Sequence, residues 1–230
     1  MSDTITRTAE PGPKVNPTLL RMTRTTPTCL WNDSASLAEL STSIGWGAVG
    51  ATCNPVIALD VLKADLPRWR RRIEEYAAAE PTASESQIGW QMVREMSQEA
   101  AALLAPVFEQ HAGRNGRLSI QTDPRLYRDP RGLVEQAVEF SRLAPNMIVK
   151  LPATKNGVLA IEEATYRGVS VNATVSFTVP QAIAVAEAVE RGLRRRESEG
   201  LDSTAMGPVC TIMRSEERRG GKEGRFRWSP

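Results

Sequence analysis

Short runs of hydrophobic and β-branched residues alternate along the chain with longer segments whose apolar residues recur at helical spacing. Short apolar runs predict buried strands, and their alternation with helices is typical of βαβ units that build a parallel sheet. The pattern predicts an α/β fold whose strands lie at residues 28–33, 47–53, 117–122, 147–151, 169–175 and 209–213. Roughly five and a half βα units are present, whereas a closed α/β barrel needs about eight.

Start signals mark several of the predicted helices. Asn54 and Pro55 precede one of them, because asparagine is a good N-terminal cap and proline fits the first helical turn. Ser84 caps a second helix, and Pro130 opens a third. Other segments are predicted to be helical from their periodicity alone. The full set of predicted helices begins at residue 56, covers 66–79 and 84–108, begins again at residue 130, and covers 156–167 and 180–196.

Length and composition favour one soluble domain. A chain of 230 residues with 41% hydrophobic content can bury one sizeable core. No segment approaches the roughly 20 consecutive apolar residues that cross a bilayer, so no membrane partner is expected. Residues 1–17 are polar, contain three prolines and lack the apolar stretch of a secretory signal. We interpret them as a disordered lead-in and expect a cytoplasmic protein.

The last seventeen residues, 214–230, differ in character from the rest of the chain. They contain six Lys or Arg, three Glu and three glycines, with no amphipathic period. The segment resembles the translated read-through of a sequencing-library adapter, and we interpret it as a non-native tail to be set aside in fold reasoning. Residues 1–213 then carry 23 basic and 24 acidic residues, a net charge of −1. The overall charge of +2 is therefore no evidence for a nucleic-acid partner.

Cysteine and histidine usage argues against disulfides and metal sites. Cys29, Cys53 and Cys210 lie far apart and form no CxxC pair. The single histidine, His111, falls where a helix is expected to end, and we interpret it as a cation at a helix C-terminus. One histidine cannot supply a metal cluster, so no metal is expected.

Lys150 is the residue that the pattern itself singles out. The segment Met-Ile-Val-Lys-Leu-Pro places an amine inside an otherwise apolar strand of the predicted parallel sheet. Burial would disfavour its charge, and a neutral lysine can act as a nucleophile. The alternative is a lysine that protects an exposed edge strand from aggregation. The strand sequence alone leaves both interpretations open.

Five segments, in order, are similar to motifs of the transaldolases. They are LWND at 30–33, GATCNPVIA at 50–58, SIQTDPRLYRD at 119–129, NMIVKLPATKNG at 146–157 and VSVNATVSFTVPQA at 169–182. The resemblance covers about residues 18–213 and implies a partial TIM (β/α)8-barrel over that range, of the class that uses a lysine Schiff base. It makes Lys150 the imine-forming lysine and requires neither a metal nor an organic cofactor.

The resemblance also assigns roles to other residues. Asp33 would act as the general base, although it could instead cap a helix that begins near Ser34. Asn54 would hold a substrate hydroxyl, or merely cap the following helix. Asn172 and Thr174 lie two residues apart on one strand and would face the same cavity, with Ser176 as a weaker candidate.

The implied activity is the transfer of a dihydroxyacetone unit between sugar phosphates in the pentose phosphate pathway, from sedoheptulose 7-phosphate to glyceraldehyde 3-phosphate, giving erythrose 4-phosphate and fructose 6-phosphate. Two departures from the family pattern keep alternatives open. Gln121 stands where transaldolases usually carry a glutamate that activates water together with a threonine, here Thr174. Barrel aldolases that act on fructose 6-phosphate or dihydroxyacetone carry glutamine there. The alternatives are therefore such an aldolase, or a non-catalytic barrel that binds a sugar phosphate.

The second departure is at the end of the sixth strand. The arginine that binds phosphate in the family follows that strand by a few residues, and it has no counterpart before the tail begins at Arg214. With strands seven and eight absent from the pattern, we expect the 230-residue polypeptide to be inactive and to aggregate or remain partly unfolded. The sequence makes no prediction of oligomeric state.

Overall fold

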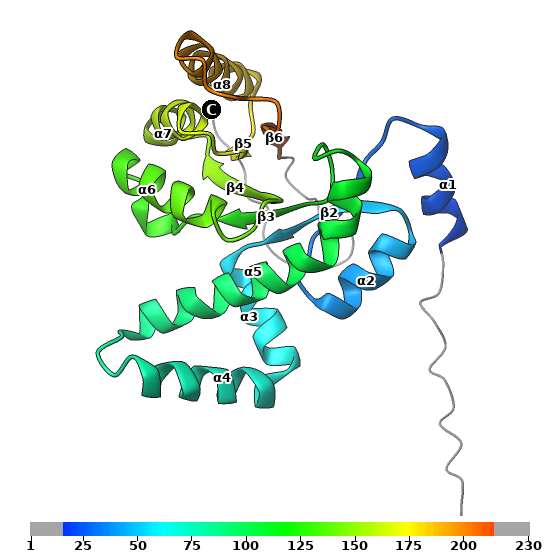
Figure 1. Ribbon diagram of the computed structural model, residues 1–230, viewed down its shortest axis with the longest axis vertical. Helices are drawn as coiled ribbons and strands as arrows, with labels where there is room; N and C mark the ends of the chain where they lie inside the picture. Colours follow the sequence, from blue (N-terminus) through cyan, green and yellow to red (C-terminus); the bar gives the residue numbers. More distant parts are fainter. Residues whose placement is uncertain (1–15, 214–230) are drawn as a thin grey trace, which may run out of the picture.

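A computed structural model describes residues 16–213 and places six parallel strands in one sheet (Figure 1). Every neighbouring pair is parallel, and the strands follow one another in chain order. The strands are β1 (Leu30–Asn32), β2 (Ala48–Cys53), β3 (Arg117–Gln121), β4 (Met147–Pro152), β5 (Val171–Ser176) and β6 (Val209–Ile212). The predicted α/β fold of an incomplete barrel is confirmed.

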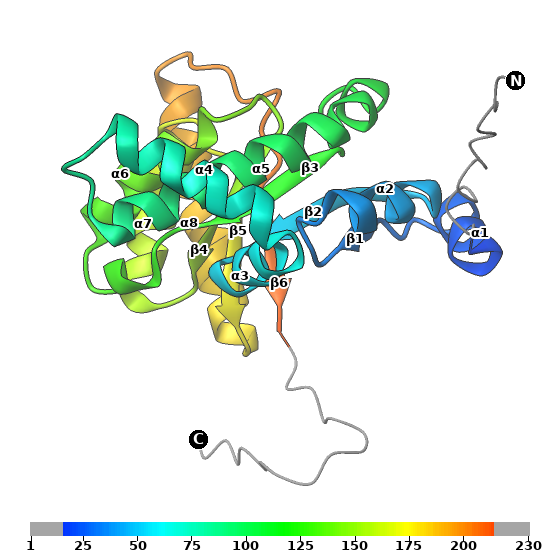
Figure 2. The same ribbon diagram turned by 90° about the horizontal axis from the view of Figure 1, so that it is seen from below.

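Helices connect the strands, because parallel neighbours need a long crossover connection. They are α1 (Pro17–Thr25), α2 (Leu37–Gly45), α3 (Pro55–Ala64), α4 (Leu66–Ala79), α5 (Glu85–Gln110), the short 3-10 helix η1 (Pro124–Leu126), α6 (Pro130–Ser141), α7 (Lys155–Tyr166) and α8 (Val179–Ser198). In Figures 1 and 2 the helices α2 to α8 lie on the outer side of a curled sheet, with α6, α7 and α8 stacked beside one another, while α1 lies apart from this layer. None of the helices within residues 16–213 combines the length and apolar character that crossing a bilayer requires.

The hydrophobic core fills the space between the sheet and this helical layer. Alternate strand residues such as Cys53, Ile120 and Leu151 are fully buried in it, because successive side chains of a strand point to opposite faces. The intervening residues face the concave side of the sheet. This alternation places the polar side chains of β2, β3, β4 and β5 together on the inner face.

The α-helices α1 and α2 and the 3-10 helix η1 are absent from the list of helices predicted from the sequence. In α1, Asn16 caps the helix, and none of its residues is buried. Pro17, assigned above to the lead-in, is the first residue of that helix. In α2, rich in serine and threonine, Ser36 accepts a hydrogen bond from Glu39 N as the N-cap. The predictions for residues 1–15 and for the tail 214–230 lie outside the described residues.

Candidate active site

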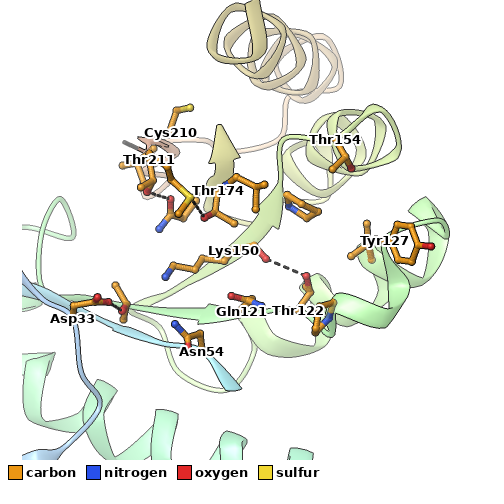
Figure 3. Close-up of a pocket in the computed structure, with 18 of the residues that line it drawn as sticks. Asp33, Asn54, Gln121, Thr122, Tyr127, Lys150, Thr154, Thr174, Cys210 and Thr211 are labelled. Carbon is orange, nitrogen blue, oxygen red and sulfur yellow. Dashed lines mark hydrogen bonds between the residues drawn. The ribbon is translucent and has the colours of Figure 1, made fainter. Parts of the chain in front are cut away.

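A cavity of about 850 Å³ opens at the carboxyl ends of the strands, on the concave side of the sheet (Figure 3). This end of a parallel α/β sheet is where ligands usually bind, because the loops that follow the strands meet there. Strands and loops from β1 to β6 line the cavity. Its polar lining includes Asp33, Thr52, Asn54, Gln121, Thr122, Lys150, Asn172, Thr174 and Thr211.

Lys150 lies at the centre of this lining. It is on β4, between its register partners Gln121 on β3 and Asn172 on β5, so it is not on an edge strand. The interpretation as an edge-strand lysine is therefore excluded. Burial lowers the pKa of the Lys150 amine, while the negative charge of Asp33 opposes this effect. The pKa remains below its usual value, which increases the neutral, nucleophilic fraction.

The backbone of Lys150 is fixed from the neighbouring strand. The Oγ1 atom of Thr122 donates a hydrogen bond to the Lys150 carbonyl at 3.1 Å, and the Thr122 amide donates to the same oxygen at 3.3 Å. Thr122 itself is buried. These bonds hold the strand that carries the amine against the strand that carries Gln121.

Asp33 lies across the cavity from the lysine, and Figure 3 shows the two side chains pointing toward one another. Its Oδ1 atom accepts a hydrogen bond of 2.6 Å from Thr52 Oγ1. It does not cap the next helix, since Ser36 performs that role in α2. The carboxylate is thus oriented by β2 and faces the cavity.

Asn54 serves both the fold and the cavity lining. Its Oδ1 atom accepts hydrogen bonds from Val56 N and Ile57 N, each at 2.9 Å, and so caps α3. The residue also lines the cavity. The two interpretations of Asn54 are compatible, because the cap uses only the oxygen of the amide.

Asn172, the register partner of Lys150 on β5, connects three strands. Its Nδ2 group donates to Ser119 Oγ at 3.0 Å, and its Oδ1 atom accepts from Thr211 Oγ1 at 2.8 Å. The next inward residue of β5, Thr174, donates to the sulfur of Met213 at 3.7 Å. Asn172 and Thr174 both line the cavity, as their spacing predicted.

Ser176 does not line the cavity, and the prediction that it faces the same way as Thr174 is wrong. The intervening residue, Val175, has a φ of 58°, which breaks the alternation of side chains along β5. Val175 faces the cavity instead. Ser176 is fully buried, and its hydroxyl has no hydrogen-bond partner among the described residues.

Several lining residues were not identified from the sequence, among them Trp31, Thr52, Tyr127 and Thr211. Thr52 lies two residues before Asn54 and therefore shares its face of the sheet, which is the signal that could have found it. Trp31 likewise lies two residues before Asp33 and shares its face of the sheet. Thr211 on β6 carries no such signal, because the pairing of β6 with β5 decides its neighbours.

No group of three or more His, Cys, Asp or Glu side chains within residues 16–213 could hold a metal ion. Cys29, Cys53 and Cys210 are all free thiols. His111 is the C-cap residue of α5, at the helix end where the sequence placed it.

The chain is similar to known transaldolases. The profile of the transaldolase/fructose-6-phosphate aldolase family matches residues 30–208. A transaldolase of Thiobacillus denitrificans is 36% identical over 177 residues, which are 74% of this chain and 47% of that protein. Transaldolase 2 of Streptomyces avermitilis is 33% identical over 183 residues, 78% of this chain and 47% of that protein. This chain therefore spans about half the length of the relatives it matches.

Proposed function

Because this chain belongs to the transaldolase/fructose-6-phosphate aldolase family, we propose that it transfers a dihydroxyacetone unit between sugar phosphates through an imine on Lys150. The observation that carries the proposal is the position of Lys150. A partly buried amine with a lowered pKa lies on the inner face of a central strand and points toward a carboxylate. Imine chemistry needs this pairing of a neutral amine with a proton acceptor.

The proposed reaction begins with attack of the neutral amine of Lys150 on the ketone carbon of the donor sugar. Loss of water gives a protonated imine. Asp33 then takes the proton of the C4 hydroxyl, and the C3–C4 bond breaks with its electron pair moving into the imine. The aldose leaves, and a three-carbon enamine stays bound to the lysine. Its C3 carbon attacks the acceptor aldehyde, Asp33 returns the proton to the new hydroxyl, and water releases the product ketose.

Other cavity residues support these steps in the proposal. Gln121 and Thr174 orient the water that leaves and re-enters, since an uncharged glutamine can donate and accept hydrogen bonds but cannot take a proton. Asn54 donates to a substrate hydroxyl with its amide nitrogen. Asn172 has one amide hydrogen on Ser119 and a second left for substrate.

The proposed substrates are those implied by the resemblance, sedoheptulose 7-phosphate and glyceraldehyde 3-phosphate on one side and erythrose 4-phosphate and fructose 6-phosphate on the other. The pentose phosphate pathway and a cytoplasmic location belong to the same proposal.

Reductive trapping tests the proposal. Because the 230-residue polypeptide alone is expected to be inactive, the full-length parent protein is incubated with fructose 6-phosphate and sodium borohydride, and peptide mass spectrometry locates the added sugar. We expect the adduct on Lys150, its loss in Lys150→Met, and its retention in Lys155→Met, which alters an exposed lysine five residues away. Binding of fructose 6-phosphate without any adduct would instead support a barrel that only binds sugar phosphates.

Gln121 supports a second candidate, cleavage without transfer by an aldolase of the same family. The named relatives are transaldolases, so transfer is the first proposal. Erythrose 4-phosphate distinguishes the two reactions. A transferase makes sedoheptulose 7-phosphate from fructose 6-phosphate faster than it releases dihydroxyacetone, whereas an aldolase releases dihydroxyacetone whether or not the acceptor is present.

A further inference from the structure

Val175 adopts a backbone conformation that a β-branched residue rarely takes. Its φ is 58°, and it directly follows Thr174 at the cavity. In this region of φ the Cβ atom crowds the backbone, so the conformation costs free energy unless its surroundings stabilise it. The turn has a consequence for the site, because it sends Ser176 into the core and leaves Val175 lining the cavity.

The side chain of Gln181 on α8 holds this turn. Its Nε2 group donates to the Val175 carbonyl at 3.0 Å and to the Ala153 carbonyl at 3.0 Å. Ala153 directly follows β4, three residues after Lys150, and its amide donates to the Thr174 carbonyl at 2.6 Å. One amide therefore joins the end of the lysine strand to the strained residue beside Thr174.

The side-chain oxygen of Gln181 accepts hydrogen bonds at the N-terminus of α8, as a residue of a helix cap commonly does. Gln181 Oε1 accepts from Phe177 N at 3.0 Å and from Thr178 Oγ1 at 3.2 Å. Gln87 occupies the equivalent position in α5, where its Oε1 atom accepts from Ser84 N and Ser84 Oγ at 2.8 Å each. A glutamate oxygen can accept these hydrogen bonds equally well. What distinguishes Gln181 is its pair of donated bonds to the ends of β4 and β5.

We propose that Gln181 is a positioning residue, whose Nε2 group fixes Thr174 relative to Lys150 by binding the Val175 and Ala153 carbonyls together. The inference rests on the proposed function of Lys150, because the rate of imine formation is its readout. Gln181 does not touch the cavity, so it acts only through the strand ends that it joins.

The substitution Gln181→Glu tests this, with Gln87→Glu as its matched control. Both variants keep the oxygen that serves the helix start, but Gln181→Glu places an oxygen against two carbonyls at hydrogen-bond distance. We expect Gln181→Glu to slow formation of the borohydride-trapped adduct by roughly 10- to 100-fold, the scale set by small misplacements of reacting groups. We expect Gln87→Glu to trap at the rate of the original chain.

Val175→Gly separates positioning from strain, since glycine accepts positive φ without penalty. Added to Gln181→Glu, it should raise the unfolding midpoint but leave trapping slow. Equal trapping rates in Gln181→Glu and the original chain, or full recovery of the rate by Val175→Gly, would overturn the inference. Absence of trapping in the unsubstituted full-length parent protein would overturn the proposed function and this inference with it. If Gln181→Glu does not fold, Gln181→Met removes the same bonds without adding a charge.

Discussion

Thr52 on β2 donates a hydrogen bond of 2.6 Å to Asp33, which follows β1, and so fixes the carboxylate that faces Lys150. An unrestrained carboxylate at the end of a strand can rotate about two bonds and form its hydrogen bonds with water. The Thr52 hydroxyl selects one orientation and leaves the second oxygen, Oδ2, for the cavity. Two adjacent parallel strands therefore supply the base and the group that orients it.

Replacement of Thr52 by valine should test that relationship. Valine keeps the β-branched shape but removes the hydroxyl, so Asp33 loses its fixed orientation. We expect the rate of sugar transfer to fall by roughly 10- to 100-fold, while borohydride trapping at Lys150 persists because the lysine is unchanged. Thr42→Val on α2, where the hydroxyl bonds only to Ala38 O, is the control and should leave both measurements unchanged. Equal transfer rates in Thr52→Val and the original chain would contradict this role.

The lowered pKa of Lys150 predicts a pH-dependent effect on stability. Between the folded pKa and the usual value of about 10.5, the unfolded chain holds a proton that the folded chain lacks. The free energy of unfolding contributed by this group therefore rises with pH across that window. Lys150→Met removes the effect, so any gain in the free energy of unfolding of this variant over the original chain should shrink in urea titrations as the pH rises toward about 10.5. Lys155→Met, at an exposed position, is the control. If the free energy of unfolding of Lys150→Met, relative to the original chain, increased with pH, burial would not be what sets the pKa of the Lys150 amine.

Strand positions could be predicted from the sequence, but neighbours across the sheet could not. The run Met-Ile-Val-Lys-Leu-Pro identified β4 because buried parallel strands are continuously apolar. It did not say whether the lysine lay on a central or an edge strand, and the order of strands decides that question. For the same reason Thr211, which reaches Asn172 from β6, carried no signal.

Local backbone conformation limited the prediction at Ser176. Two-residue alternation holds only while every residue of the strand stays extended, and the positive φ of Val175 breaks it. Positive φ is usually signalled by glycine or asparagine, and neither occurs at this position. By contrast, Asn54 and Ser84 predicted helix starts correctly, because capping depends on residues that are close in sequence.

Asp123 is expected to contribute to stability through the turn that follows Gln121. Its hydrogen bond with Arg125 holds the pKa of the carboxyl below its usual value, and Trp90 Nε1 donates to Oδ2 at 3.1 Å. We expect Asp123→Asn to lower the free energy of unfolding by about 1–3 kcal/mol near neutral pH, the range for a buried group that loses a charge-assisted partner.

The sign of the pH dependence follows from that lowered pKa. Stability from ionised Asp123 is present above about pH 3.8 and is lost as the pH falls through the lower pKa of the folded state. The difference between Asp123→Asn and the original chain should therefore narrow in acid, as measured by urea unfolding. Asp60→Asn, at an exposed site on α3, provides the comparison and should change little at any pH. If the difference in the free energy of unfolding between the two chains stayed constant as the pH fell, the Asp123–Arg125 ion pair would not be its source.

Asn54 offers a way to separate binding from folding, because its oxygen caps α3 while its amide nitrogen is the proposed donor to substrate. Asn54→Asp retains a capping oxygen and should change the free energy of unfolding by only a few tenths of a kcal/mol, whereas Asn54→Ala should lower it by about 1 kcal/mol. Both variants lack the donor, so each should bind fructose 6-phosphate about tenfold more weakly in calorimetric titrations. Asn16→Asp, at the matching cap of α1 and outside the cavity lining, should leave binding unchanged. If Asn54→Asp bound fructose 6-phosphate as tightly as the original chain, Asn54 would act only as a helix cap.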